Sequence, residues 1–142
     1  MTTIAFRDGI MASDSMIECN GWLSPCIEVE KIRKVTNGAL IGLAGNPTFF
    51  DPFCDWFLGI KNERPVLNDT MILVALPDGQ LEEYTQHGKI VLSLSKPFFA
   101  IGSGTPAALG AMCAGATAER AVSIAALLDP YTGGRIQVKH LK

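Results

Sequence analysis

The two histidines of the sequence, His87 and His140, give no sign of a catalytic base. His87 follows Gln86 and precedes Gly88, which is a turn context, and His140 lies two residues from the end of the sequence. No local signature marks a Ser-His-Asp or Cys-His arrangement, although such sites are recognised by geometry and stay open at this point. A general base is therefore better sought elsewhere in the chain.

The α-amino group of the chain can itself act as a base. Its reference pKa of about 7.7–8.0 leaves a useful fraction unprotonated near neutral pH. A threonine at the start of a chain carries its hydroxyl and its amine on adjacent carbons, so the amine can take the hydroxyl proton. Thr2 would hold this position once Met1 is removed, and we expect methionine aminopeptidase to remove it because threonine is small. Many proteins have threonine second, so Thr2 alone is weak evidence.

The cysteines do not suggest a metal site. None forms a Cys-x-x-Cys pair, and both histidines are distant in sequence, so the spacing argues against zinc. We expect no metal and no cofactor.

No basic region followed by an apolar stretch marks a signal peptide, so we expect four reduced thiols in a cytoplasmic protein. Two of them, Cys54 and Cys113, are interpreted as small apolar packing groups. The four are Cys19, Cys26, Cys54 and Cys113.

Composition indicates one folded domain, residues 1–142. Hydrophobic residues make up 48% and charged residues 18%, with a formal net charge of -2. This is enough apolar material for a core, and no basic stripe supports nucleic-acid binding. No apolar run is long enough to cross a bilayer, so we expect no membrane partner.

Hydrophobic alternation and turn residues predict strands in pairs, and apolar residues at helical spacing predict three helices. The segment 15–28 is expected to be irregular. Antiparallel hairpins with helices segregated from them indicate the α+β class. The expected strands are 2–6, 10–13, 31–36, 39–44, 71–75, 81–85, 90–94, 98–101 and 135–141, and the expected helices are 46–59, 105–116 and 117–128.

Six segments in register carry a family resemblance. The chain resembles the proteasome β subunits and the bacterial HslV peptidase, which are N-terminal-nucleophile (Ntn) hydrolases. No single motif is specific, but six in order over residues 2 to 134 are hard to explain by chance. The segments are Thr2-Thr3-Ile4-Ala5-Phe6, Ala12-Ser13-Asp14-Ser15, Glu30-Lys31-Ile32-Arg33-Lys34-Val35, Leu40-Ile41-Gly42-Leu43-Ala44-Gly45, Ala100-Ile101-Gly102-Ser103-Gly104 and Asp129-Pro130-Tyr131-Thr132-Gly133-Gly134.

The resemblance implies roles for seven residues. Thr2 matches the nucleophile, Lys31 the cation that lowers the pKa of its hydroxyl and amine, and Asp14 the carboxylate that fixes the lysine. Gly45 matches the backbone N–H donor to the oxyanion, a contact that contributes about 3 kcal/mol in other enzymes. The remaining three, which match the polar cluster around the terminal amine, are Ser103, Asp129 and Thr132. Taken alone, Lys31 is better interpreted as a solvated charge on a strand and Asp14 as a turn residue.

The resemblance also implies a four-layer α/β/β/α sandwich of two antiparallel sheets. Only residues 46–59 can be helical between Gly45 and the next hairpin, so one helix of the family is expected to be missing. By alignment, Val29, Arg33, Leu43 and Pro47 would line the pocket for the substrate residue before the cut. Arg33 there suggests an acidic or polar preference.

The implied function is a threonine endopeptidase that acts through an acyl-enzyme on Thr2, inside a homo-oligomeric ring. Peptides or unfolded proteins would be its substrates, and an ATPase unfoldase is a candidate partner. Two alternatives are an Ntn amidase acting on a small amide and an inactive structural ring subunit. The set Thr2, Asp14, Lys31, Ser103 and Asp129 argues against the inactive subunit, because lost catalysis would remove the reason to keep them.

Overall fold

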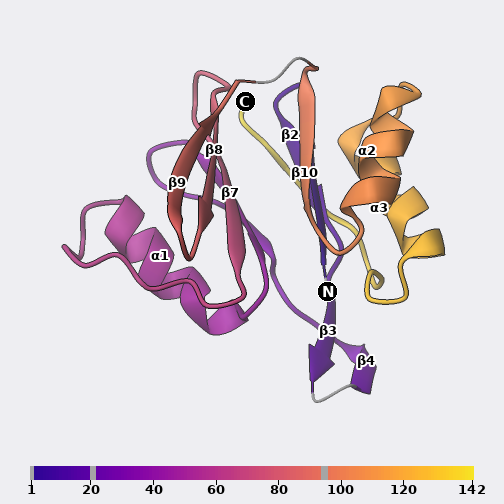
Figure 1. Cartoon of the computed structure of the whole chain (residues 1–142), viewed down its shortest axis with the longest axis horizontal. Coiled ribbons are helices and arrows are strands. Elements are labelled where there is room, and N and C mark those ends of the chain that lie inside the picture. The colour runs from indigo at the N-terminus through magenta and orange to yellow at the C-terminus, as the bar shows by residue number, and fades with distance from the viewer. Residues whose placement is uncertain (1, 20–21, 94–95) are drawn as a thin grey trace.

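The computed structural model describes residues 2–19, 22–93 and 96–142, without the side chains of residues 19 and 23–26. Two antiparallel sheets face each other and helices cover both outer surfaces (Figure 1). The order of layers is helix, sheet, sheet, helix, which confirms the predicted α/β/β/α sandwich. No helix among the described residues is long and apolar enough to span a membrane.

The first sheet has four strands in the order β10-β1-β2-β11 and carries the start of the chain. Its central hairpin joins β1 and β2 through Asp8 and Gly9, which both adopt positive φ, as the Asp-Gly turn signal predicts. Helices α2 and α3 pack on its outer face. The elements are β1 (Thr3–Arg7), β2 (Ile10–Ser13), β10 (Phe98–Gly102), β11 (Gln137–His140), α2 (Thr105–Cys113) and α3 (Ala118–Leu128).

The second sheet has five strands in sequence order, β5-β6-β7-β8-β9, and α1 covers its outer face. A short 3-10 turn, η1, leads into α1, and together they replace the single helix predicted for 46–59. Pro52 lies in the first turn of α1, where it removes no helical hydrogen bond. The elements are β5 (Ile32–Lys34), β6 (Leu40–Ala44), β7 (Met71–Ala75), β8 (Leu81–Thr85), β9 (Gly88–Leu92), η1 (Pro47–Phe49) and α1 (Phe50–Phe57). Between β6 and β7, residues 45–70 hold only this helical segment, as predicted.

Three apolar clusters fill the three spaces between the layers. The middle cluster, between the sheets, includes Ile4, Met11 and Leu73. The cluster under α2 and α3 is rich in alanine, which lets the helices lie close to the sheet. The cluster under α1 includes Phe50 and Phe53, so part of the aromatic run is core, as its helical spacing indicated.

Two expectations are wrong. Residues 15–28 are not irregular, because β3 (Met16–Cys19) and β4 (Trp22–Glu28) form a two-stranded ribbon that projects from one end of the sandwich (Figure 1). The prediction rested on Gly21 and Pro25 and did not use Asn20-Gly21 as a hairpin signal. Cys54 is buried as expected, but Cys113 is exposed at the end of α2 and is not a packing group.

Candidate active site

Thr2 directly precedes β1 and is almost fully buried, with 3% of its surface exposed. Its carbonyl accepts a hydrogen bond from the Gly104 N–H at 3.4 Å. The turn from β10 into α2 passes so close that a Cβ on Gly102 would lie 2.0 Å from the Thr2 carbonyl oxygen. Only glycine fits there, and this close approach fixes the backbone of Thr2 against β10.

A chain of hydrogen bonds begins at the Thr2 nitrogen. It donates to Ser103 Oγ at 3.2 Å, and the Ser103 hydroxyl donates to Asp129 Oδ2 at 2.6 Å. The Thr132 hydroxyl donates to the same carboxylate oxygen at 2.6 Å, and the Tyr131 N–H donates to Oδ1 at 3.2 Å. The carboxylate therefore keeps the Ser103 oxygen turned towards the Thr2 nitrogen as an acceptor.

The pKa of Asp129 is lowered from its ordinary value. Partial burial alone would raise this pKa, but the hydrogen bonds from Ser103, Thr132 and the Tyr131 backbone outweigh burial. Asp129 is thus a carboxylate at neutral pH, able to accept all three bonds at once.

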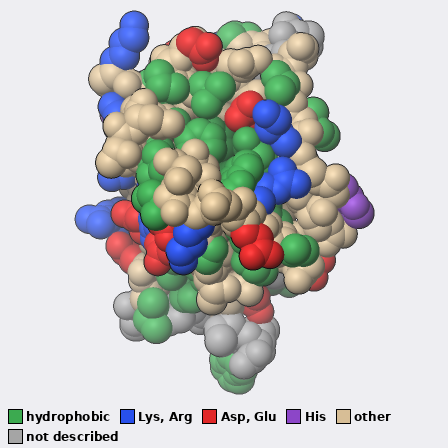
Figure 2. Space-filling view, turned by 90° about the vertical axis from the view of Figure 1, so that its left-hand side faces the viewer, with side chains coloured by type: hydrophobic (Ala, Val, Ile, Leu, Met, Phe, Trp, Pro, Cys, Tyr) green, Lys and Arg blue, Asp and Glu red, His purple; other side chains and the backbone are tan. Residues whose placement is uncertain are grey.

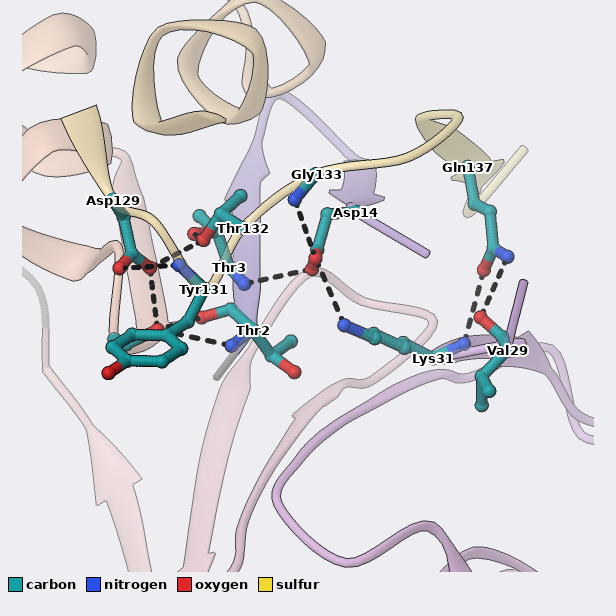
Figure 3. A network of polar contacts seen from close by, with 11 residues as sticks. Thr2, Thr3, Asp14, Val29, Lys31, Asp129, Tyr131, Thr132, Gly133 and Gln137 are labelled. Atoms are coloured by element: carbon teal, nitrogen blue, oxygen red, sulfur yellow. Dashed lines mark hydrogen bonds and ion pairs between the residues drawn. The ribbon is translucent and has the colours of Figure 1, made fainter. Parts of the chain in front are cut away.

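On the other side of Thr2, Lys31 and Asp14 form a buried ion pair. Lys31 Nζ lies 3.0 Å from Asp14 Oδ2. Asp14 also accepts the Thr3 N–H at 3.0 Å on Oδ1 and the Gly133 N–H at 3.1 Å on Oδ2. Three donors thus compensate the buried carboxylate. Figure 3 shows Thr2 between the Asp129 cluster and the Lys31 ammonium.

Burial lowers the pKa of Lys31 from its ordinary value, and the opposing attraction of Asp14 only partly offsets this effect. The Lys31 side chain is only 8% exposed. A cation in so little water acts strongly on neighbouring groups, because few solvent dipoles screen it.

Gly45 follows β6 on the wall of the same cavity as Thr2 and Lys31. Its φ is +140°, and a Cβ there would lie 2.7 Å from Thr70 Cα and 2.8 Å from the Asp69 carbonyl oxygen. Both the dihedral angle and the space require glycine. The backbone at Gly45 can therefore run along the cavity without a side chain in the way.

The cavity beside Thr2 has a volume of about 560 Å³. Val29, Leu43 and Pro47 line it, as the alignment implied. Arg33 does not, because its guanidinium pairs with Glu30 and Asp51 and stacks over the Phe50 ring. The acidic or polar preference predicted from Arg33 is therefore wrong. The lining residues are Thr2, Met16, Ile17, Glu18, Val29, Glu30, Lys31, Leu43, Gly45, Asn46, Pro47, Phe49, Asn68 and Asp69.

The structure brings all seven predicted site residues to one place, although they come from both sheets and from the loops between them. Sequence reasoning missed Thr3, whose hydroxyl lies 2.7 Å from that of Thr132, and Gln137, which contacts the backbone at Lys31. It also missed the cavity wall made by β3. Thr3 stands beside Thr2 in the opening segment, but no sequence signal marks Gln137.

The described residues contain no group of three His, Cys, Asp or Glu side chains that could hold a metal ion. The arrangement places the buried Thr2 between the Lys31 ammonium and a polar cluster that binds the Thr2 nitrogen. This cluster consists of Ser103, Asp129 and Thr132. The predicted loss of Met1 concerns a residue outside those that the structure describes.

No protein-family model matches the chain, and no curated protein matches it. Solved structures do. Thiobacillus denitrificans BPH is 24% identical with a TM-score of 0.69, covering 99% of this chain and 98% of that one. The same protein in complex with epoxomicin is 25% identical with a TM-score of 0.68, covering 99% of this chain and 98% of that one. Eukaryotic HslV from Trypanosoma brucei gives 16% and a TM-score of 0.71, covering 96% of this chain and 97% of that one. This chain therefore has the four-layer Ntn-hydrolase fold of the HslV and proteasome β-subunit type.

Proposed function

We propose that the chain is a threonine endopeptidase that cleaves peptide bonds through an acyl-enzyme on Thr2. One observation carries the proposal: a buried threonine faces a cavity of about 560 Å³, with the Lys31–Asp14 ion pair on one side and its nitrogen bonded to Ser103 on the other. The mechanism requires a free amine on Thr2 and therefore the prior loss of Met1.

In the first half of the reaction the neutral amine accepts the hydroxyl proton while the Thr2 oxygen attacks the peptide carbonyl carbon. One N–H of the amine donates to Ser103 Oγ, and in the proposed mechanism the lone pair points towards the hydroxyl. The Lys31 ammonium disfavours a second positive charge nearby, so it favours the neutral amine and a more acidic hydroxyl. The Gly45 N–H stabilises the oxyanion of the tetrahedral intermediate.

Collapse of the intermediate breaks the carbon–nitrogen bond, and the Thr2 ammonium gives its proton to the leaving amine. The first product departs and an ester on Thr2 remains. A water molecule then attacks the ester while the amine again accepts a proton, and the carboxylic acid product leaves. Each cycle consumes one water and restores the threonine hydroxyl.

The proposal extends to the setting of the enzyme. The resemblance to HslV and proteasome β subunits supports a homo-oligomeric chamber in the cytoplasm, with peptides or unfolded proteins as substrates. An ATPase unfoldase is the partner that such a chamber would use.

A peptide epoxyketone such as epoxomicin tests the mechanism, because it reacts with a hydroxyl and a free amine on the same residue. Epoxomicin is the ligand in the complex of Thiobacillus denitrificans BPH. Intact-mass measurement of the protein expressed in bacteria should show loss of one methionine, and one epoxomicin adduct should map to Thr2. Hydrolysis of a mixed peptide library should occur in the same preparation.

Thr2→Ala should lose the adduct and the hydrolysis while keeping the fold, because only a hydroxyl and a methyl group are removed. Thr36→Ala, in the exposed turn before β6, is the matched control and should behave as the parent. Acetylation of the Thr2 amine should also stop turnover. A protein that retains Met1 and still cleaves peptides would contradict the N-terminal mechanism.

A further inference from the structure

The segment 133–137, which leads into β11, contacts both members of the buried ion pair. The Gly133 N–H donates to Asp14 Oδ2 at 3.1 Å. Four residues later, Gln137 Oε1 accepts the Lys31 N–H at 3.1 Å, and Gln137 Nε2 donates to the Val29 carbonyl at 3.0 Å. Figure 3 shows the Gln137 amide facing the backbone of this segment, with both hydrogen bonds drawn.

The Gln137 side chain hydrogen-bonds the backbone of residues 29–31 in the way that a neighbouring strand would. One primary amide satisfies an N–H and a carbonyl two residues apart, as a peptide group in a ladder does. Residues 29–31 lie between β4 and β5, outside the regular strands, although the Lys31 carbonyl accepts the Leu43 N–H at 2.9 Å. Gln137 thus ties this segment to the first sheet, where Gln137 itself pairs with Ser13.

The segment that Gln137 holds has two tasks at the site. Val29 lines the cavity, and the Lys31 side chain reaches from the same backbone to Asp14. A lysine side chain has many rotamers, so the direction of its ammonium depends on a fixed backbone. A shift of this segment would move the ammonium and the cavity wall together.

We infer that Gln137 is a positioning residue, which sets the Lys31 ammonium and the Val29 wall through two hydrogen bonds to their backbone. The inference rests on the proposed function for its kinetic consequences. It does not place Gln137 in contact with substrate. Loss of the amide should lower kcat through Lys31 and raise KM through Val29.

Two variants separate the two bonds. Gln137→Met keeps the length of the side chain and removes both bonds, so we expect kcat/KM to fall about tenfold, the effect of one or two net hydrogen bonds. Gln137→Glu keeps the acceptor for the Lys31 N–H but faces the Val29 carbonyl with a carboxylate. We expect its kcat to stay near that of the parent while KM rises. Gln80→Met, the same change at an exposed glutamine in the turn before β8, is the matched control.

A second readout does not need activity. Nuclear magnetic resonance of the lysine ammonium groups, assigned with Lys31→Arg, would follow the titration of Lys31. In Gln137→Met we expect the pKa of Lys31 to move up towards the ordinary lysine value, because a looser segment lets water reach the ammonium. Circular dichroism and thermal melting check that both variants fold.

The outcomes are distinguishable. If Gln137→Met is folded and keeps the parent kcat, KM and Lys31 titration, the inference is wrong whatever the enzyme does. If the parent forms no adduct and cleaves no peptide, but the Lys31 titration moves in Gln137→Met, the proposed function fails and the positioning role stands.

Discussion

At the scale of single residues, the charge on Lys31 is the feature on which the proposed chemistry depends most. Its ammonium is buried beside Asp14, and it is the one basic side chain among the described residues that line the cavity. Removing this charge in a folded protein therefore tests the site more sharply than removing a surface charge.

Lys31→Ala should lower kcat/KM by roughly 10²-fold or more, as for other activated nucleophiles and positioned acid–base groups. Lys31→Arg should also be impaired, because a planar guanidinium cannot take the place of a compact ammonium in a closed site. Peptide hydrolysis with purified variants is the measurement. Activity equal to that of the parent in Lys31→Arg would show that the charge of Lys31 has a structural role only.

The pH profile of kcat/KM should be bell-shaped. The acid limb follows deprotonation of the Thr2 amine, whose reference pKa is about 7.7–8.0. The alkaline limb follows Lys31: burial lowers its pKa, so the required cation is lost at a lower pH than for an exposed lysine. Activity is thus present below the Lys31 pKa and lost above it. A profile flat up to the ordinary lysine value of 10.5 would contradict this assignment.

The cavity should prefer a basic substrate residue. Three acidic side chains, Glu18, Glu30 and Asp69, and one basic side chain, Lys31, line it; Glu30 pairs with Arg33, and Lys31 pairs with Asp14. We expect peptides with lysine or arginine before the cut to be cleaved about tenfold better than those with glutamate, less so at high salt. Asp69→Asn should reduce the preference, and asparagine tolerates the positive φ of this position. Equal cleavage of both peptides would exclude charge selection.

At the scale of elements, alanine substitutions at the N-cap and in the interior of α2 are expected to change stability in opposite directions. A Cβ on Gly104, the N-cap of α2, would lie 1.9 Å from Thr3 Oγ1 and 3.1 Å from Thr132 Oγ1. Gly104→Ala should therefore destabilise the protein by about 1–3 kcal/mol and disturb the site. Gly110, inside α2, has open space around its Cβ position. Gly110→Ala should stabilise the protein by about 0.5–1 kcal/mol.

Thermal and denaturant unfolding of the two alanine variants measures this difference. The pair is matched in chemistry and differs only in what the added methyl group meets. Similar stability of both variants would show that the turn from β10 into α2 yields easily, and that Thr2 is held less firmly than its contacts indicate.

At the scale of the whole molecule, the face that carries α1 is apolar in part. Hydrophobic side chains gather over the middle and upper part of this face (Figure 2). In the loop after α1, Ile60 and Val66 are 68% and 67% exposed. The aromatic run itself is less available than its sequence suggested, because Phe50 and Phe53 are buried. Exposed apolar groups on such a face favour contact with another subunit.

We expect a homo-oligomer of roughly six or more subunits with cyclic symmetry, an expectation that rests on the family resemblance. Light scattering at micromolar concentration is the measurement, and Val66→Asp should weaken the assembly if this face is the contact. Asp78→Asn, in the exposed turn before β8, is a control that should leave the assembly unchanged. A monomeric parent would count against a chambered protease and in favour of an amidase.

The sequence by itself determined the features that depend on local physics. Hairpins at Asp8-Gly9 and Asn37-Gly38, the strands 71–75 and 81–85 and the Thr117 cap of α3 follow from turn chemistry, alternation and capping, which act over a few residues. The seven candidate site residues could also be named, because they stand in motifs that a family resemblance can match.

Only the tertiary structure decided what depends on distant pairing. The ribbon of β3 and β4 supplies part of the cavity wall, and this placement depends on how the ribbon lies against the two sheets. Arg33 does not line the cavity because its guanidinium pairs with Asp51, 18 residues away in the sequence. Gln137 reaches Lys31 across 106 residues. Such contacts arise from how the two sheets stack, and no local pattern in the chain encodes which side chains then meet.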